Sequence, residues 1–359
     1  MKKSTCVKAG ITAAALTAAA LLGGTVIPAA QAAGQEGSAS PATTNAGIPA
    51  TVDPDTDLAA HTPGKETLWN DSIYFTSSVK AGGHDFGVLV HTIHFPNADK
   101  RALAVSVTDK TTGWYKKHEA AYTKDDYAWS TGGLDIRTPD LTWTGNAHTM
   151  HIEANTPWGS LKLQFTAKGP ALKYAGTGSF PLLGDLQYEF ALPALDTTGS
   201  LTVNGTTHKV SGETWLDRQW GPVSLADPTM HWTWMNLSLP NGDKLAIWDA
   251  VNSKEENAWA TVLHPDGSYD LAAVKPLAED AHRFWTSPTS GNSYPTRWRV
   301  EIPSLKTRLS VRITGTDGQE LTGGFGVSRM EATASFTGTY QGKKVSGENY
   351  VEMPGNWKR

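Results

Sequence analysis

Hydrophobic and polar residues alternate along most of this chain with a period of two. The pattern begins near Glu66 and is typical of strands, because successive side chains of a strand point to opposite faces of a sheet. It is clearest at residues 86–95, 102–107, 148–153, 161–165, 245–251, 297–302 and 309–314. Only residues 277–284 suggest a helix, and that segment is short. The pattern therefore predicts a protein built mainly from strands.

Tight-turn sequences separate these runs. Asn204-Gly205, Asn241-Gly242 and Asp317-Gly318 are examples. Such pairs favour short hairpins, because Asn, Asp and above all Gly tolerate the positive φ that these turns need. Many short strands joined by tight turns are typical of sandwiches and barrels. We predict an all-β, antiparallel fold.

One long hairpin sequence occurs twice. Residues 199–217 are echoed by residues 334–352, with a shared Lys-Val-Ser-Gly-Glu core and a carboxylate, Asp217 or Glu352, at the end of each copy. A hairpin that returns after a domain-sized interval indicates two copies of one domain. We predict an N-terminal domain of residues 65–221 and a C-terminal domain of residues 222–359.

The N-terminal segment has the features of an export signal. Basic residues precede an apolar run at 11–27, and a small-residue site ends at Ala32. This order predicts a secretory signal peptide of residues 1–32, cleaved near Ala32, and a secreted, extracellular protein. Residues 33–64 are rich in small residues, Thr and Pro, and we expect them to form a flexible linker.

Composition excludes several kinds of function. The only cysteine, Cys6, lies in the predicted leader, so the mature chain has no thiol for disulfides, metal binding or catalysis. The net charge is −4 and no basic stripe is present, so we expect no nucleic-acid partner. We also expect no integral membrane segment after signal cleavage. The sequence specifies no oligomeric state.

The segment richest in unusual side chains lies near the end of the first repeat. In a strand, Trp215, Asp217 and Gln219 would share one face, which places a carboxyl group between an indole and an amide. We expect this face to point into a barrel. Trp232 and Trp234 follow closely and would also share a face. These residues are our candidates for a binding site.

Two motifs resemble a known family. Gly-x-x-Trp-x-Asp-x-x-Trp-Gly at 212–221, and the ending at 342–355, resemble carotenoid 1,2-hydratase and AttH-type proteins. Fungal kievitone hydratase and Diels–Alderase-type cyclases are similar. The resemblance extends from about Lys65 to the C-terminus. It implies two tandem lipocalin-like antiparallel β-barrels, with a pocket for a lipophilic small molecule at or near their junction.

The resemblance also implies roles for single residues. Asp217 stands where hydratases of the family are proposed to have the acid that protonates a carbon–carbon double bond. Tyr188 and Phe190 lie in the strand that carries further His and Trp partners in carotenoid hydratases. Those enzymes tend to have Tyr where this chain has Trp215. This difference argues against carotenoids as substrates.

The implied chemistry is physically reasonable without a cofactor. Protonation of an alkene needs a carboxylic acid that stays neutral, and burial in an apolar pocket favours the neutral form. Indole faces stabilise a desolvated cation by roughly 1–2 kcal/mol each. Water held by Gln219 or Tyr188 could then add to the cation. His231 is the histidine that we expect nearest to Trp232 and Trp234.

Three functions remain open at this level: a hydratase, a cofactor-free isomerase or cyclase, and a non-catalytic carrier of lipophilic ligands. A purely structural interpretation is an ion pair between Asp217 and Arg218, with the tryptophans as packing. Glu66, Glu189 and Asp249 could pair across a pocket, as carboxylates do in glycosidases.

We expect no metal site. His91 and His94 are three residues apart, as are His148 and His151, so in a strand the members of each pair face opposite sides.

Overall fold

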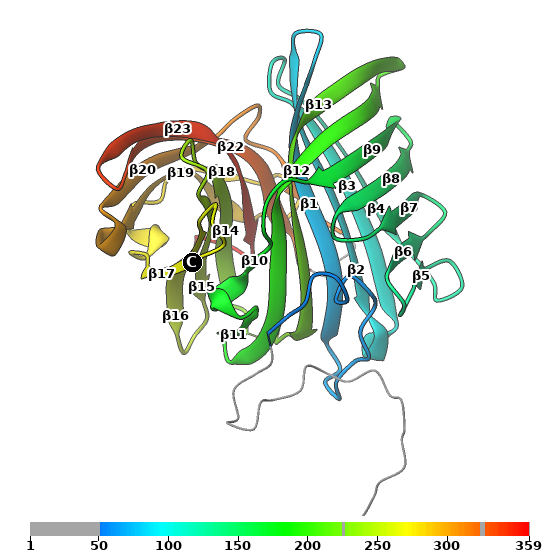
Figure 1. Ribbon diagram of the computed structural model, residues 1–359, viewed down its shortest axis with the longest axis horizontal. Coiled ribbons are helices and arrows are strands. Elements are labelled where there is room, and N and C mark those ends of the chain that lie inside the picture. The colour runs from blue at the N-terminus through cyan, green and yellow to red at the C-terminus, as the bar shows by residue number, and fades with distance from the viewer. Residues whose placement is uncertain (1–50, 225–226, 324–326, 359) are drawn as a thin grey trace, which may run out of the picture. The chain divides into compact units, whose positions relative to one another are not determined.

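The computed structural model describes residues 51–224, 227–323 and 327–358. These residues form two antiparallel sheets, one after the other along the chain (Figure 1). Each of the seven alternating runs that we expected to be strands lies in a strand, apart from one terminal residue, His148 in one run and Thr314 in another. The short segment at 277–284 is instead a single 3-10 turn followed by the start of a strand, because a segment of about two turns is too short to sustain a helix.

The N-terminal sheet has 13 strands in the order β4-β3-β2-β1-β13-β12-β9-β8-β7-β6-β5, with β10 and β11 also paired to β12. The strands are β1 (Trp69–Ala81), β2 (His84–Phe95), β3 (Lys100–Asp109), β4 (Trp114–Ala121), β5 (Ala128–Trp129), β6 (Leu134–Arg137), β7 (Leu141–Gly145), β8 (Thr149–Thr156), β9 (Gly159–Ala167), β10 (Leu172–Lys173), β11 (Ser179–Leu182), β12 (Asp185–Val203) and β13 (Thr206–Pro222).

The C-terminal sheet has 10 strands in the order β17-β16-β15-β14-β23-β22-β20-β19-β18, with β21 also paired to β22. The strands are β14 (His231–Ser238), β15 (Lys244–Val251), β16 (Glu256–Leu263), β17 (Tyr269–Ala273), β18 (His282–Thr286), β19 (Ser293–Ile302), β20 (Thr307–Ile313), β21 (Glu320–Leu321), β22 (Arg329–Tyr340) and β23 (Lys343–Pro354). The 3-10 turns are η1 (Pro96–Ala98), η2 (Tyr174–Gly176), η3 (Leu277–Glu279) and η4 (Pro303–Leu305).

The repeated sequence occupies the same place in both sheets. Hairpin β12–β13 is central to the first sheet and hairpin β22–β23 to the second. Asp217 lies opposite Ala191 in one hairpin, and Glu352 lies opposite Glu331 in the other. The adjoining strands also correspond, because β1 pairs with β13 and β14 pairs with β23. The two carboxylates at the ends of the repeats therefore have equivalent positions.

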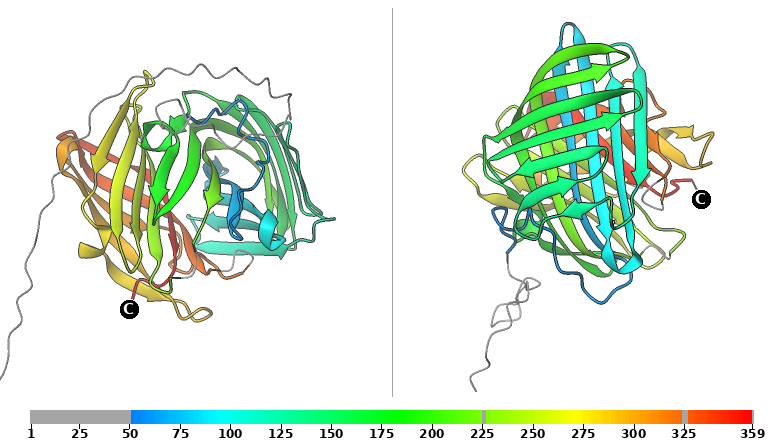
Figure 2. Two further views of the ribbon diagram at one scale, coloured as in Figure 1. Left: turned by 90° about the horizontal axis from the view of Figure 1, so that it is seen from below. Right: turned by 90° about the vertical axis from the view of Figure 1, so that its right-hand side faces the viewer.

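Each sheet curls around its own hydrophobic core (Figure 2). Along β13, Leu216 and Trp220 point into the N-terminal core, as the period of two requires. A third apolar cluster joins the sheets and contains Trp215 together with Trp234 and Trp248 of the C-terminal sheet. Our expectation that the face of Asp217 points into a barrel is therefore wrong. That face points toward the other sheet.

Residues 51–64 do not behave as a free linker. Val52 and Leu58 are buried in the N-terminal core, and the blue segment in Figure 2 lies across the open end of that sheet. Arg218 donates hydrogen bonds to the carbonyl oxygens of Asp57 and Ala59. The composition of this segment did not indicate that it packs on the sheet, because only two of its residues, Val52 and Leu58, are buried in the N-terminal core. The predicted signal peptide and residues 33–50 lie outside the described residues.

The same guanidinium rules out the proposed ion pair between neighbours. Arg218 is fully buried and pairs with Asp71, with 2.5 Å between the guanidinium nitrogen and the carboxylate oxygen. It points to the side of β13 opposite to Asp217, since the two residues are adjacent in a strand. In the described part of the chain, no helix combines the length and the apolar character needed to cross a membrane.

Candidate active site

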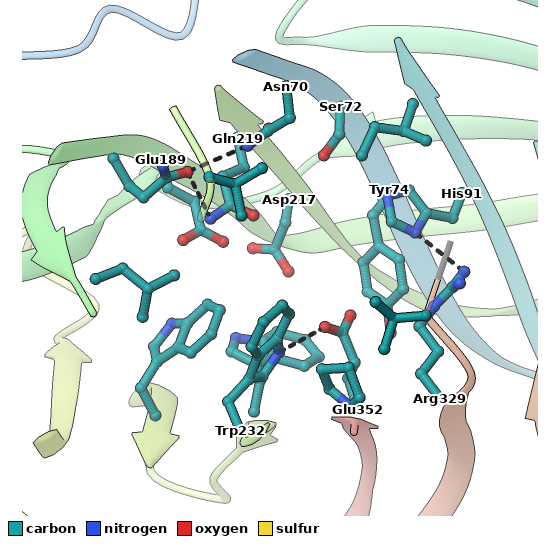
Figure 3. A pocket seen from close by; sticks show the side chains of 18 of the residues that line it. Asn70, Ser72, Tyr74, His91, Glu189, Asp217, Gln219, Trp232, Arg329 and Glu352 are labelled. Carbon is teal, nitrogen blue, oxygen red and sulfur yellow. Dashed lines mark hydrogen bonds between the residues drawn. The ribbon is translucent and has the colours of Figure 1, made fainter. Parts of the chain in front are cut away.

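A cavity of about 120 Å³ lies between the two sheets. Strands β1, β2, β11, β12 and β13 contribute one wall, and β14, β15, β22 and β23 contribute the other (Figure 3). Its lining combines carboxyl groups, amides, indoles and aliphatic side chains: Asn70, Ser72, Tyr74, His91, Ile93, Phe95, Leu182, Gln187, Glu189, Asp217, Gln219, Val223, Trp232, Trp234, Trp248, Val327, Arg329, Glu352 and Pro354.

Asp217 is held in the cavity wall by two neutral donors. The Trp215 indole and the Tyr174 hydroxyl each donate a hydrogen bond of 2.9 Å to its Oδ1 atom. The Trp234 indole in turn donates to the Tyr174 hydroxyl at 3.0 Å, so that hydroxyl is fixed with its proton directed at Asp217. Both donors reach the same oxygen. The second oxygen, Oδ2, is therefore the one that can present a proton to a ligand.

Burial keeps the Asp217 carboxyl group protonated near neutral pH. The loss of water around the group raises its pKa from 3.8 to about 8, and the neighbouring Glu352 carboxyl acts in the same direction. The hydrogen bonds from Trp215 and Tyr174 oppose this rise but do not cancel it. Asp217 therefore has the property required of a general acid in an apolar pocket.

Two further carboxyl groups line the same cavity. Glu189 is buried, and its Oε2 atom has no hydrogen-bond partner within the described residues. Burial raises the pKa of Glu189 well above its ordinary value, and Asp217 and Glu352 reinforce the shift. Glu352 accepts a 2.8 Å hydrogen bond from the Trp232 indole. Burial also raises the pKa of Glu352, although the positive charge of Arg329 opposes the rise.

A charged cluster adjoins Glu352. The Arg329 Nε atom donates to Oε1 of Glu331 at 2.7 Å, and the Tyr74 hydroxyl donates to Oε2 at 3.1 Å. Arg329 also donates to Nδ1 of His91 at 3.4 Å. Burial, and then the nearby guanidinium, keep the pKa of His91 well below its ordinary value, so this imidazole is neutral. The cluster places one guanidinium among several acids.

Three indoles form the aromatic part of the cavity wall. Trp232, Trp234 and Trp248 all line it, and the latter two are almost completely buried. Trp248 stacks on Trp259 with an interplanar angle of 10°, which fixes the orientation of its ring. Such surfaces favour apolar ligands and can stabilise a cation next to them. This part of the cavity suits an unsaturated hydrocarbon group.

A chain of amides closes another side of the cavity. Asn70 and Gln219 each donate to the amide oxygen of Gln187, at 3.4 Å and 3.2 Å. Asn70 also donates to the carbonyl oxygen of Gly221 at 3.1 Å. These groups provide neutral hydrogen-bonding partners beside the carboxyl groups, where water or a polar part of a ligand can be held.

The structure brings most of the candidate residues together. Asp217, Gln219, Trp232 and Trp234 line the cavity, and Trp215 contacts it through its bond to Asp217. The shared face that we expected for Trp215, Asp217 and Gln219 is therefore present.

Three other candidates lie elsewhere. Tyr188 stacks on Trp220, and Phe190 packs edge-on against the same indole, inside the N-terminal core. Glu189, between them in β12, is the residue that faces the cavity, because neighbours in a strand alternate in direction. His231 packs against Trp357 and does not line the cavity, although it is adjacent to Trp232.

The sequence indicated only some of the other residues of the site. Glu189 was among three carboxylates that we considered for a pocket, and it lines the cavity. The other two do not line it: Asp249 accepts a hydrogen bond from the backbone N–H of Leu277, and Glu66 is exposed. Glu352 ends the second repeat, and its match with Asp217 was the available signal. Tyr174 lies in the irregular turn η2, next to a residue with φ of 51°, and no periodic pattern marked it.

The described residues contain no group of three or more His, Cys, Asp or Glu side chains arranged to hold a metal ion. The carboxyl groups of the cavity differ in their surroundings. Asp217 carries a proton near neutral pH, a guanidinium stands near Glu352, and an aromatic wall adjoins both. This arrangement can donate a proton to an apolar ligand and take up a proton nearby.

Known proteins share both this sequence and this fold. The chain is 30% identical over 221 residues to the dehydratase asqC of Emericella nidulans, a match that covers 58% of this chain and 62% of the relative. It is 28% identical over 241 residues to kievitone hydratase of Fusarium solani subsp. phaseoli, covering 63% and 67% of the two chains. The aligned part thus spans about three-fifths of the dehydratase and two-thirds of the hydratase.

The fold agrees with these relatives. The crystal structure of kievitone hydratase from Nectria haematococca superimposes with a TM-score of 0.70 and 22% identity, over 86% of this chain and 98% of that one. The all-β, lipocalin-like architecture that we predicted is thereby confirmed. A family model described as AttH-like matches residues 94–356, most of the chain. The protein belongs to the AttH-like family.

Proposed function

We propose that this protein is a hydro-lyase that adds water to a carbon–carbon double bond of a lipophilic small molecule, such as a prenylated or terpenoid compound. The observation that supports it best is Asp217, a carboxyl group held protonated by burial in the wall of an aromatic cavity. The reaction needs only a proton, a stabilised cation and water. No organic cofactor is required.

The first step is proton transfer from Asp217. Its O–H bond breaks, a C–H bond forms at one alkene carbon, and positive charge develops on the other. The hydroxyl of Tyr174 and the indole N–H of Trp215 stabilise the carboxylate that remains, because both already donate to Oδ1. General acid catalysis of this kind contributes roughly 10²–10⁴-fold to the rate.

The second step is capture of the cation by water. The indoles of Trp232, Trp234 and Trp248 offer negative π-faces to the positive charge, each worth up to ~2 kcal/mol in a desolvated site. The amides of Gln187 and Gln219 can hold the water that attacks. Loss of a proton from this water completes the alcohol, and the reverse sequence dehydrates it.

The relatives support this class of reaction, since one is named a dehydratase and the other a hydratase. Removal and addition of water are the two directions of one equilibrium. We extend the proposal to location: the sequence at residues 1–32 indicates export, with cleavage near Ala32. N-terminal sequencing of protein recovered from the culture medium of an expressing bacterium tests this part.

The test of the activity compares the native protein with Asp217→Asn, which keeps both hydrogen-bond donors satisfied but cannot supply the proton. Kievitone, ortho-prenylphenol and geraniol are incubated with each protein, and products are identified by mass spectrometry. We expect a product heavier by one water with the native protein, and a rate at least ~100-fold lower with Asp217→Asn.

Other outcomes would replace the proposal. A product of unchanged mass would indicate an isomerase or cyclase that uses the same cavity. Compounds that bind both proteins equally and emerge unchanged would indicate a carrier. Hydration at an equal rate by Asp217→Asn would remove Asp217 from the mechanism.

A further inference from the structure

Both copies of the internal repeat contribute a residue to the cavity lining. Asp217 ends the first copy and Glu352 ends the second, and the two strands that carry them, β13 and β23, have equivalent places in their sheets. Both side chains line the one cavity, from opposite sheets. Figure 3 shows their carboxyl groups directed toward each other across it. The repeated position therefore supplies two facing carboxyl groups.

Each of these carboxyl groups is oriented by an indole. Trp215 donates to Asp217 at 2.9 Å, and Trp232 donates to Glu352 at 2.8 Å. In both cases the indole N–H contacts one oxygen of the carboxyl group, and Glu352 also shares a hydrogen bond with the Glu331 carboxyl. The two groups differ in their further neighbours. Asp217 has the neutral hydroxyl of Tyr174 beside it, whereas Glu352 has the guanidinium of Arg329 nearby.

We propose that Glu352 is the catalytic base of this site, which takes the proton from the attacking water while Asp217 supplies the proton to the alkene from the opposite wall. The assignment rests on the hydro-lyase function proposed above. It gives the repeated position two different tasks in one reaction.

The electrostatic surroundings favour this division. The carboxyls of Asp217, Glu189 and Glu331, the guanidinium of Arg329 and the Trp232 N–H all act on Glu352. Of these, Arg329, the Trp232 N–H and the hydrogen bond with Glu331 favour its charged form, in that order. The neighbours of Glu189 raise its pKa without opposition, so Glu189 remains protonated and is a poor base. Two acids whose surroundings differ in this way can serve as acid and base at one pH.

The full step is balanced without any other reactant. The Asp217 proton forms the new C–H bond, the water oxygen forms the new C–O bond, and the second water proton moves to Glu352. Proton exchange with solvent then restores Asp217 and Glu352. Since the acid and the base act from opposite walls, hydrogen and hydroxyl are added to opposite faces of the double bond. A single carboxyl group in both roles would add them to the same face.

The first experiment compares Glu352→Gln with Glu348→Gln, the same substitution four residues earlier on the same strand and outside this cavity. Rates with ortho-prenylphenol are measured across pH. The reaction requires ionised Glu352 and protonated Asp217, so we expect the native rate to rise and then fall with pH. Glu352→Gln should lower kcat by roughly 100-fold and remove the rising limb, with KM little changed. Glu348→Gln should keep both limbs.

A second variant and a stereochemical measurement complete the test. Trp232→Phe removes the N–H that favours ionised Glu352, so the rising limb should move to higher pH. The stereochemistry is measured in D₂O with ortho-prenylphenol that has carbon-13 in one defined methyl group. Deuterium marks the carbon that is protonated, and the labelled methyl makes the carbon that receives the hydroxyl stereogenic. We expect the product in which deuterium and hydroxyl have added to opposite faces. Addition to one face, or a native rate in Glu352→Gln, would overturn the role of Glu352 alone. No hydrate from the native protein would overturn the hydro-lyase proposal as well.

Discussion

Strands β13 and β23 each carry two carboxyl groups that face the other sheet. One pair, Asp217 and Glu352, lies at the aromatic cavity, and we call the other pair, Glu213 and Glu348, the polar level. Glu213 and Glu348 lie four residues before Asp217 and Glu352 on β13 and β23. Four residues along a strand return to the same face, so all four groups point toward the opposite sheet. Strand, face and repeat position are matched. Only the neighbours differ.

At the polar level each glutamate binds a serine and a lysine of the other sheet. The two clusters are Ser78–Lys110–Glu348 and Ser238–Lys244–Glu213. The glutamates have equivalent positions in the repeat, whereas Lys110 follows β3 and Lys244 begins β15. The lysine ammonium lies 2.8 Å from the carboxylate in both, and the serine hydroxyl lies 2.5 Å and 2.6 Å away, respectively. These contacts link the sheets and neutralise the glutamates. They surround a polar cavity of about 440 Å³.

The comparison shows what makes a carboxyl group suitable for acid chemistry here. Burial acts to raise the pKa of Glu348, but the hydrogen bonds from Lys110 and Ser78 and the ammonium charge outweigh it, and the pKa falls. Asp217 has only neutral donors, so burial dominates and its pKa rises to about 8. The absence of a directly bound cation at Asp217 is therefore as important as its burial.

The largest expected effect concerns stability against pH. The folded protein keeps the Asp217 proton up to about pH 8, while the unfolded chain loses it near 3.8. The folded state is thus favoured at low pH, and this contribution is lost as pH rises, by about 1.4 kcal/mol per pH unit. Between pH 5 and 7 the loss is about 3 kcal/mol. Asp217→Asn should remove that part of the slope in the free energy of unfolding, measured with urea.

Asp196→Asn is the control, because the Asp196 side chain is 63% exposed and pairs with Lys168 at the surface. It should leave the pH dependence as in the native protein. Equal slopes for all three proteins would contradict the view that Asp217 is buried in its neutral form.

A lysine placed beside Asp217 would give this carboxyl group a cationic neighbour like those of Glu213 and Glu348. Gln219 shares the face of Asp217 and lies opposite Glu189, so Gln219→Lys introduces an ammonium beside both acids. A nearby cation lowers the pKa of a carboxyl by 1–3 units, which would leave about half of Asp217 or less protonated at pH 7. We expect hydration at pH 7 to slow by about 2- to 100-fold, with the optimum at lower pH.

Gln219→Met is the matched variant, since it has similar length and no charge. The comparison of interest is Lys against Met, because both variants lose the Gln219 amide that donates to Gln187. If the two variants react equally fast across the pH range, the missing cation is not what preserves the acid.

The sequence predicted those parts of this site that depend on a period of two. The alternation placed Trp215, Asp217 and Gln219 on one face, and the repeat marked Glu352. Periodicity cannot say which face of a sheet meets a second sheet, since both faces are apolar here: one fills the curled sheet and the other joins the partner. This is why the face of Asp217 was assigned to a barrel interior.

The residues that the sequence missed depend on long-range contacts. Tyr174 reaches Asp217 from an irregular turn 43 residues away in the chain, fixed by the bond of Trp234 and by the Thr261 hydroxyl, which accepts from the backbone N–H of Ala175. In β12, resemblance drew attention to Tyr188 and Phe190, whereas the pairing of Glu189 with Gln219 directs only Glu189 to the cavity. Local patterns contain neither fact.

A smaller effect is expected at the polar level itself. Lys110→Met and Lys244→Met each remove one ammonium from a cluster whose glutamate side chain is 42% or 49% exposed, respectively. Because water can reach these carboxylates, each substitution should lower the free energy of unfolding by about 1 kcal/mol or less. The loss from Lys110→Met should be the larger of the two, because Lys110 also pairs with Asp85 at 2.8 Å, and both losses should shrink at high salt. A loss of several kcal/mol from either lysine would contradict this view of the clusters.

The smallest effect tests one hydrogen bond at Asp217. Trp215→Phe keeps an aromatic ring but removes the N–H that favours the charged carboxylate, so the pKa of Asp217 should rise further above about 8. Since hydration requires the protonated acid, the alkaline limb of the rate profile should move to higher pH by less than ~1 unit, with the rate at pH 7 nearly unchanged. Trp143→Phe is the control, because that indole is buried in the N-terminal core and its N–H has no hydrogen-bond partner in the described structure. A limb that stays in place in Trp215→Phe, or moves equally in both variants, would show that the indole affects Asp217 through packing and not through its hydrogen bond.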